Sequence, residues 1–464
     1  MSMLDTVLIW ISRNHKRWQG DLEKWLSIPS VSAQEAHAGD VREAAEWAED
    51  YLRNIGLKVE IIATPRHPVI LATTPAELAE PGAPEVLLYG HYDVQPPEPL
   101  DLWQSPPFKP TVRDGKLYAR GANDDKGQVH AHLAAMLAWR EINQKLPVRM
   151  TVLLEGEEEI GSPNLMAVVQ AHAAQLRACK TLIISDGNQF AKGVPSIIYG
   201  LRGLVYAELT VTTANTDLHS GQFGGAVANP ANALARIIAQ LHDEQNRVTV
   251  PGFYTDVRPL TDTERAAWRQ LPFDEAKFAG DLGVPAVTGE AGYSTLERLW
   301  GRPTLDVNGL TSGYQGPGAK TVLPCRASCK VSMRLVPDQA PAAIMAAFDA
   351  HVQSLAPAGT KVEVHWHGPG SPPALTAVTG PAIAAAQRAI TTGYGIAPVL
   401  CREGGSIPVV TWFQQALGLE AVMIGFGLPD DRIHAPNEKI DLDGYFGGIR
   451  TAAALYEELG QALR

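Results

Sequence analysis

The chain has 464 residues, a formal net charge of -11 and 45% hydrophobic residues. This length is enough for more than one domain with a large core. The acidic balance argues against a nucleic-acid partner and against an anionic membrane surface. Four scattered cysteines are too few for a disulfide framework, and no segment has the pattern of a targeting peptide or a membrane span. We therefore expect a cytoplasmic protein with reduced thiols.

The first 199 residues alternate between helical and strand-like segments. Apolar spacing of about 3.6 residues predicts helices within 1–55 and over 128–142. Apolar, β-branched runs predict buried strands at 58–62, 69–73, 85–89, 150–154 and 180–185. This alternation favours an α/β domain with a mostly parallel sheet flanked by helices.

The pattern changes after residue 199. Alternating strands are predicted at 204–212, 328–336 and 361–367, and helices at 229–242 and 341–355. This order indicates a split βαβ arrangement whose fourth strand lies within 303–325. Helices at 380–393 and 442–463, with a strand at 420–424, return to the first pattern. We expect a catalytic domain in two parts, 1–199 and 371–464, interrupted by a smaller α+β domain at 200–370.

An acidic stretch, Glu155-Gly156-Glu157-Glu158-Glu159, directly follows the predicted strand at 150–154. Unpaired carboxylates at the end of a buried strand are costly. A metal ion removes that cost, because one carboxylate can bind it while a neighbour stays free to act as a base. Taken in isolation, such a stretch also suits a solvated turn.

Three further segments favour the metal interpretation. His91 and Asp186 each follow an apolar run, and Asp124 precedes a predicted helix. In open α/β sheets, ligands bind beyond the carboxyl ends of the strands. Imidazoles and carboxylates together suit Zn²⁺, Mn²⁺ or Co²⁺. Two such ions, about 3.5–4 Å apart, polarise a carbonyl and generate hydroxide near neutral pH, and a carboxylate that is not a ligand can serve as general base.

Five motifs carry a resemblance to a known family. They begin, in chain order, at His91-Tyr92-Asp93, Asn123-Asp124-Asp125, Glu155-Gly156, Ser185-Asp186 and His434-Ala435-Pro436. In this order the chain resembles the co-catalytic di-zinc peptidases that include carnosinase, cytosolic nonspecific dipeptidase, aminoacylase and glutamate carboxypeptidase. Segments 318–324, 332–337 and 402–408 are most similar to the carnosinase and nonspecific dipeptidase branch, and only 250–300 lacks a matching motif.

The resemblance implies two divalent metal ions per subunit, Zn²⁺ first and Mn²⁺ or Co²⁺ as alternatives. Its implied ligands are His91, Asp124, Glu159, Asp186 and His434. Asp124 would bridge the two ions, with a cis peptide bond to Asp125. His91 and Asp186 would complete one ion's ligands, and Glu159 and His434 the other's.

The resemblance also implies roles beyond the metal ligands. Glu158 would be the general base, and Asp93 would orient His91. Arg334 would bind the substrate carboxylate. Its expected partners in holding the substrate are Thr321, Gly405 and Ser406. The inserted domain would be a lid and dimerisation domain of a homodimer, in which His219 reaches the active site of the other subunit.

The function implied is hydrolysis of dipeptides or short peptides. An N-acyl-amino-acid deacylase or a carboxypeptidase would share every metal ligand and stays open as the alternative. A binding or scaffold protein that has lost catalysis would be expected to lack Glu158 or a ligand, and this sequence has the full set.

Overall fold

The computed structural model describes residues 1–464, which form two compact units. Unit 1 comprises Met1–Tyr199, Thr376–Cys401 and Trp412–Arg464, and unit 2 comprises Gly200–Leu375 and Arg402–Thr411. None of the helices has the length and apolar character of a membrane span.

Unit 1 is built on a mixed sheet with the strand order β1-β2-β6-β3-β7-β17-β8. The strands are β1 (Lys58–Ile62), β2 (Val69–Thr73), β3 (Glu85–His91), β6 (Arg149–Glu155), β7 (Leu182–Ile184), β8 (Ser196–Leu201) and β17 (Ala421–Ile424). The central strands β6, β3, β7 and β17 run parallel, and the pairs at either side are antiparallel. The parallel α/β core predicted from the apolar runs is therefore confirmed.

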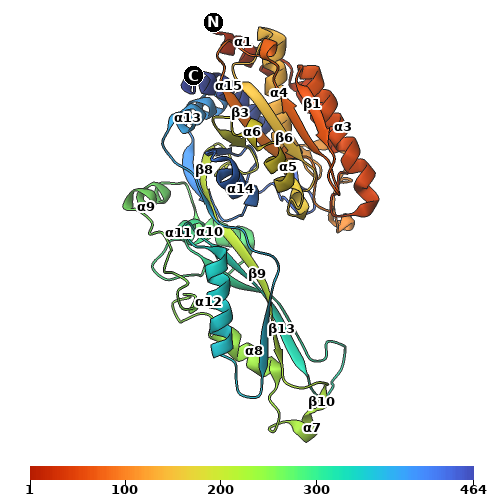
Figure 1. The fold of residues 1–464 in the computed structure, drawn as a ribbon, viewed down its shortest axis with the longest axis vertical. Coiled ribbons are helices and arrows are strands. Elements are labelled where there is room, and N and C mark those ends of the chain that lie inside the picture. The colour runs from red at the N-terminus through yellow and green to blue at the C-terminus, as the bar shows by residue number, and fades with distance from the viewer. The chain divides into compact units, whose positions relative to one another are not determined.

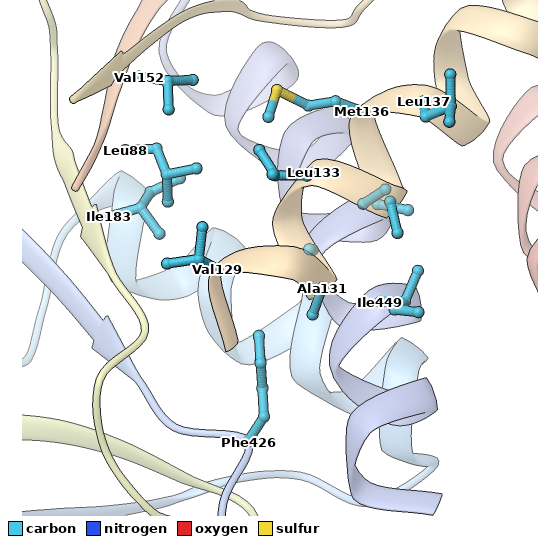
Figure 2. Packing of buried hydrophobic residues seen from close by; sticks show 14 of the residues in the cluster. Leu88, Val129, Ala131, Leu133, Met136, Leu137, Val152, Ile183, Phe426 and Ile449 are labelled. Carbon is cyan, nitrogen blue, oxygen red and sulfur yellow. The ribbon is translucent and has the colours of Figure 1, made fainter. Parts of the chain in front are cut away.

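Helices pack on this sheet through apolar faces. The longer helices of unit 1 are α1 (Met3–Arg13), α2 (His15–Leu26), α3 (Ala38–Ile55), α4 (Lys126–Asn143), α13 (Pro381–Tyr394) and α15 (Leu442–Ala462). Figure 2 shows Val129 and Leu133 of α4 facing the strand residues Leu88, Val152 and Ile183, all of them buried. Burying a side chain of this size contributes about 1.5–3 kcal/mol, so this layer fixes the start of α4 against the ends of the strands.

Smaller elements complete unit 1. The short helices are α5 (Leu165–Ala171) and α6 (Ala173–Leu176), and α14 (Pro408–Leu417) begins in the 402–411 segment of unit 2. A separate antiparallel sheet joins β4 (Thr111–Arg113), β5 (Lys116–Tyr118) and β18 (Lys439–Asp441). This sheet ties the C-terminal part of unit 1 to the loop that precedes α4.

Unit 2 contains a four-stranded antiparallel sheet with the order β11-β13-β9-β14. Its strands are β9 (Gly203–Thr212), β11 (Thr304–Ser312), β13 (Arg326–Leu335) and β14 (Lys361–Trp366). β11 is the fourth strand expected within 303–325. Alternate residues of β9 are buried, which fits the packing of α8 (Pro230–Ala239) and α12 (Pro341–Ser354) on one face (Figure 1).

The part of unit 2 without a clear sequence pattern forms short helices. They are α9 (Asp262–Arg269), α10 (Glu275–Leu282) and α11 (Thr295–Gly301). At the end of the β9–β13 pair lie β10 (Leu218–His219), β12 (Val322–Leu323) and α7 (Ser220–Phe223) (Figure 1).

Candidate metal centre

Several of the candidate site residues in unit 1 lie at or just after the carboxyl ends of three adjacent parallel strands, β6, β3 and β7. His91 is the last residue of β3 and pairs with Glu155 at the end of β6. Glu158 and Glu159 lie in the single 3-10 turn that follows β6, and Asp186 comes two residues after β7. Because these strands are neighbours, the side chains after them converge at one edge of the sheet.

Two groups of potential metal ligands share one residue. The ligand atoms of His91, Asp124 and Asp186 lie within 4.8 Å of one another, and so do those of Asp124, Glu159 and His434. His434 Nε2 is 2.8 Å from Asp124 Oδ2 and 3.3 Å from Glu159 Oε2, and His91 Nε2 is 3.1 Å from Asp124 Oδ1. Asp124 belongs to both groups, and its peptide bond to Asp125 is cis, as expected.

The carboxylates of this cluster repel one another. Burial raises the pKa of Glu158 well above its ordinary value, and His91 nearby offsets only part of this effect. Burial, with Asp124 nearby, raises the pKa of Asp186 to about 7. Asp124 is the exception: the neighbouring imidazoles of His434 and His91 outweigh its burial and lower its pKa. Positive charge at this place would stabilise the whole group in its ionised form.

The residues present fit two divalent cations. His91 is completely buried, and its Nε2 atom has no hydrogen-bond partner although it points to the carboxylates. A buried nitrogen in this state is costly unless it binds something. Each ligand group combines one imidazole with two carboxylates, a donor set that suits Zn²⁺, Mn²⁺ or Co²⁺.

Asp93 fixes the loop that carries Glu158. Its carboxylate accepts hydrogen bonds from the main-chain N–H groups of Glu158 at 3.2 Å and Glu159 at 3.0 Å, and from Ser32 Oγ at 2.6 Å. His91 Nδ1 lies 3.1 Å from the main-chain carbonyl of Asp93 and 3.4 Å from its carboxylate. Asp93 therefore contacts His91 through its main-chain carbonyl and, slightly farther away, its carboxylate, and its role in orienting His91 stays a prediction.

Glu438 is a further residue of the candidate site for which the sequence predicted no role. This buried carboxylate accepts hydrogen bonds from the N–H groups of Gly121, Asn123 and Asp124 and from Arg120 Nη1, at 2.7–3.1 Å. It thereby holds the Asp124 loop from a segment that also carries His434. Glu438 lies at the end of the sequence motif that begins at His434, and this position was the only sequence evidence for it. No local sequence pattern indicates which groups it would bind.

The remaining predicted site residues lie in unit 2, in two separate places. Arg334 Nη1 donates a hydrogen bond to Ser406 Oγ at 2.9 Å, and Gly405 is the neighbouring residue in the same turn. At the other end of the β9–β13 pair, the Ser220 N–H donates to the carbonyl of Thr321 at 3.0 Å, beside the exposed His219.

The class of protein that this fold and this pair of ligand groups define is a metal-dependent hydrolase. Residues 87–458 match the profile of peptidase family M20/M25/M40. The chain belongs to this family of peptidases.

Similar proteins within this family are named for different peptidase activities. The Cys-Gly metallodipeptidase DUG1 of Candida albicans is 32% identical over 95% of this chain and 94% of its own length. The structure of human carnosine dipeptidase 1 is 31% identical, covers 99% of both chains and has a TM-score of 0.86. The metallo-carboxypeptidase Sso-CP2 of Sulfolobus solfataricus is 32% identical, covers 96% of this chain and 99% of its own, and has a TM-score of 0.84.

Proposed function

We propose that this protein is a metallodipeptidase that cleaves dipeptides or short peptides at a dinuclear metal centre. The observation that carries the proposal is the pair of ligand groups that share Asp124, with Glu158 beside them as a carboxylate outside both groups. The dipeptidases among its relatives support the choice of a dipeptide as substrate.

The proposed reaction divides the work between the cations and the chain. When bound, the two cations supply Lewis acidity toward the peptide carbonyl and a water nucleophile that ionises near neutral pH. Glu158 accepts the proton of this water and passes it to the amine that leaves. Asp93 keeps Glu158 in place through the main-chain hydrogen bonds, so the base does not depend on a flexible loop.

Arg334 is the proposed partner of the substrate's C-terminal carboxylate. A guanidinium recognises a carboxylate with two parallel hydrogen bonds. The Ser406 hydroxyl accepts a hydrogen bond from Arg334 and so helps to orient its guanidinium, and Gly405 is proposed to offer main-chain N–H groups to the carboxylate. Thr321 lies beside His219 and is proposed to contact the substrate from the same subunit as His219.

The separation of these groups within unit 2 supports a homodimer. Arg334 and Arg326 lie at opposite ends of β13, and the His219 segment lies beyond the Arg326 end. Eight residues of strand span about 26 Å, whereas a dipeptide spans about 7 Å. One dipeptide cannot contact Arg334 and His219 of the same unit 2. If both act on it, His219 must come from a second subunit, where its imidazole would stabilise the oxyanion.

The metal and the compartment are further parts of the proposal. Zn²⁺ is the proposed ion, since two histidines and three carboxylates suit its preference for mixed nitrogen and oxygen ligands. A cytoplasmic location is proposed because the four cysteines form no disulfide.

A dipeptide panel on the metal-depleted protein tests the proposed function. After chelation and reloading with Zn²⁺ or Mn²⁺, dipeptides should be hydrolysed at least about tenfold faster, by kcat/KM, than N-acetyl amino acids or longer peptides. Activity confined to N-acetyl amino acids would identify a deacylase. Release of C-terminal residues from long, N-terminally blocked peptides would identify a carboxypeptidase, the second candidate, which the Sulfolobus relative favours.

A further inference from the structure

Unit 2 contains a cavity of about 710 Å³ that is rich in arginine. Its walls come from β11, β13, α11, the residues on either side of α11, the 242–248 segment after α8, and Arg202. The segment without a clear sequence pattern therefore contributes only part of the lining, at 288–290 and 298–299. Four guanidinium groups line it: Arg202, Arg298, Arg302 and Arg334. Arg334 is also the residue proposed above to bind the substrate carboxylate.

Only one of these arginines is neutralised inside the cavity. Arg302 donates to both carboxylate oxygens of Glu290, at 2.6 and 2.8 Å. Arg202, Arg298 and Arg334 have no carboxylate within 4.0 Å and bond instead to the carbonyl of Gly404, the carbonyl of Glu290 and the hydroxyl of Ser406. The other acidic residue in the lining is Asp306, which is exposed and accepts a hydrogen bond from Thr304.

The charge balance of the lining is therefore positive. The lining contains four arginines and two carboxylates, those of Glu290 and Asp306, so it has an excess of two positive charges. The chain as a whole has a net charge of -11. Burial, together with the nearby Arg334, lowers the pKa of Arg202 to about 10. Like charges that are partly buried without counter-ions are destabilising, so an anionic ligand would relieve a cost present in the free protein.

We propose that this cavity binds the acidic side chain of the substrate's C-terminal residue, so that the enzyme prefers dipeptides that end in Asp or Glu. This inference rests on the proposed function, in which Arg334 binds the α-carboxylate. With Arg334 used in that way, Arg202 and Arg298 are the two unpaired guanidiniums left for a second carboxylate. The two carboxylates of a C-terminal Asp or Glu are separated by only three or four bonds, which suits groups in one cavity.

The test compares dipeptides that differ only in charge. The kcat/KM of Ala-Glu relative to Ala-Gln, and of Ala-Asp relative to Ala-Asn, should favour the acid by about 10–100-fold, the range expected for one charged hydrogen-bonded pair. In Arg298→Gln and in Arg202→Gln this preference should fall toward unity. A ratio of two substrates on one preparation is insensitive to partial unfolding, so it remains informative if a variant is less stable.

Arg236→Gln is the matched control. Arg236 is an exposed arginine on α8 of the same unit and does not line the cavity, so both activity and preference should be retained. Equal rates for the acid and the amide in the wild type, or a preference unchanged in both cavity variants, would overturn the inference while leaving the dipeptidase proposal intact. Inhibition by inorganic phosphate without acid preference would assign the cavity to a free anion instead. Failure to cleave any dipeptide would refute the proposed function itself.

Discussion

Glu438 accepts a hydrogen bond from the main-chain N–H of Asp124 at 3.1 Å, across 314 residues of sequence. The same carboxylate binds the N–H groups of Gly121 and Asn123, and Arg120 balances its charge. Asp124 is the residue common to both ligand groups. A fixed Asp124 main chain therefore keeps the two groups in register with each other.

Glu438→Gln should weaken metal binding by about 10–100-fold, the usual cost of losing a residue that orients a ligand. Glutamine has one acceptor oxygen where the glutamate has two, and Arg120 loses its counter-charge. Competition with a chelator would measure the affinity. Glu157→Gln is the matched control: Glu157 is equally buried and hydrogen-bonded, to His67, Thr64 and Asn164, and belongs to neither ligand group. Equal losses in the two variants would contradict a specific role for Glu438.

Much of the metal centre could be predicted from the sequence because its signals are local. An apolar run identifies a buried strand, and a residue at or just after its end lies at the carboxyl edge of the sheet, where the structure has His91 and Asp186. The part played by Glu438 could not be predicted in the same way, because its four donors come from a segment more than 300 residues away.

The helices of the segment 250–300 could not be predicted from the spacing of its apolar residues. Capping boxes at Thr261 and Glu264, and at Ser294 and Glu297, mark the starts of α9 and α11 in the sequence. The helices themselves have seven or eight residues, too short for a clear apolar period. Tertiary contacts stabilise these helices, such as the 2.7 Å ion pair between Arg265 and Glu297.

Arg334→Ala should impair substrates with a free C-terminal carboxylate by about 2–5 kcal/mol, which is the usual cost of removing one partner of a hydrogen-bonded charge pair. C-terminally amidated analogues of the same dipeptides should be affected much less, because they offer no charge to lose. Steady-state kcat/KM for each acid and amide pair measures the difference. Equal losses on both would show that Arg334 does not bind the carboxylate.

His219 and Glu158 should complement each other between subunits. Glu158→Gln and His219→Ala are each expected to be inactive alone. When the two are co-expressed, random pairing makes about half of the dimers mixed, and one site in each mixed dimer is whole, so about a quarter of all sites should recover. A co-expressed sample as inactive as its parents, with mixed dimers verified by two affinity tags, would refute action between subunits.

Because His130 is buried in its neutral form, the free energy of unfolding should fall in mild acid. Burial among Trp47, Tyr51 and Tyr445 lowers its pKa to about 3, while an unfolded histidine has a pKa of about 6.5. Below pH 6.5 the unfolded chain binds a proton that the folded chain excludes. The free energy of unfolding should therefore fall by roughly 1.4 kcal/mol per pH unit, down to about pH 3, from this residue alone.

Urea unfolding at pH 6.5 and pH 5 measures the contribution of His130. In His130→Gln the amide can still bond to the Tyr445 hydroxyl, which His130 Nδ1 contacts at 2.7 Å, but it does not titrate. The wild type should lose roughly 1.5–2 kcal/mol more than this variant over the interval. Parallel losses in the two proteins would show that His130 does not carry the effect.

The most direct test of a dinuclear metallopeptidase with Glu158 as general base is to measure metal content and turnover together. Both are measured in the wild type and in Glu158→Gln. Both proteins should hold two divalent ions per chain, because Glu158 belongs to neither ligand group. Dipeptide hydrolysis should fall in the variant by at least about 10²–10⁴-fold, the range contributed by general acid–base catalysis. Loss of an ion from Glu158→Gln, or turnover within about tenfold of the wild type, would contradict the account.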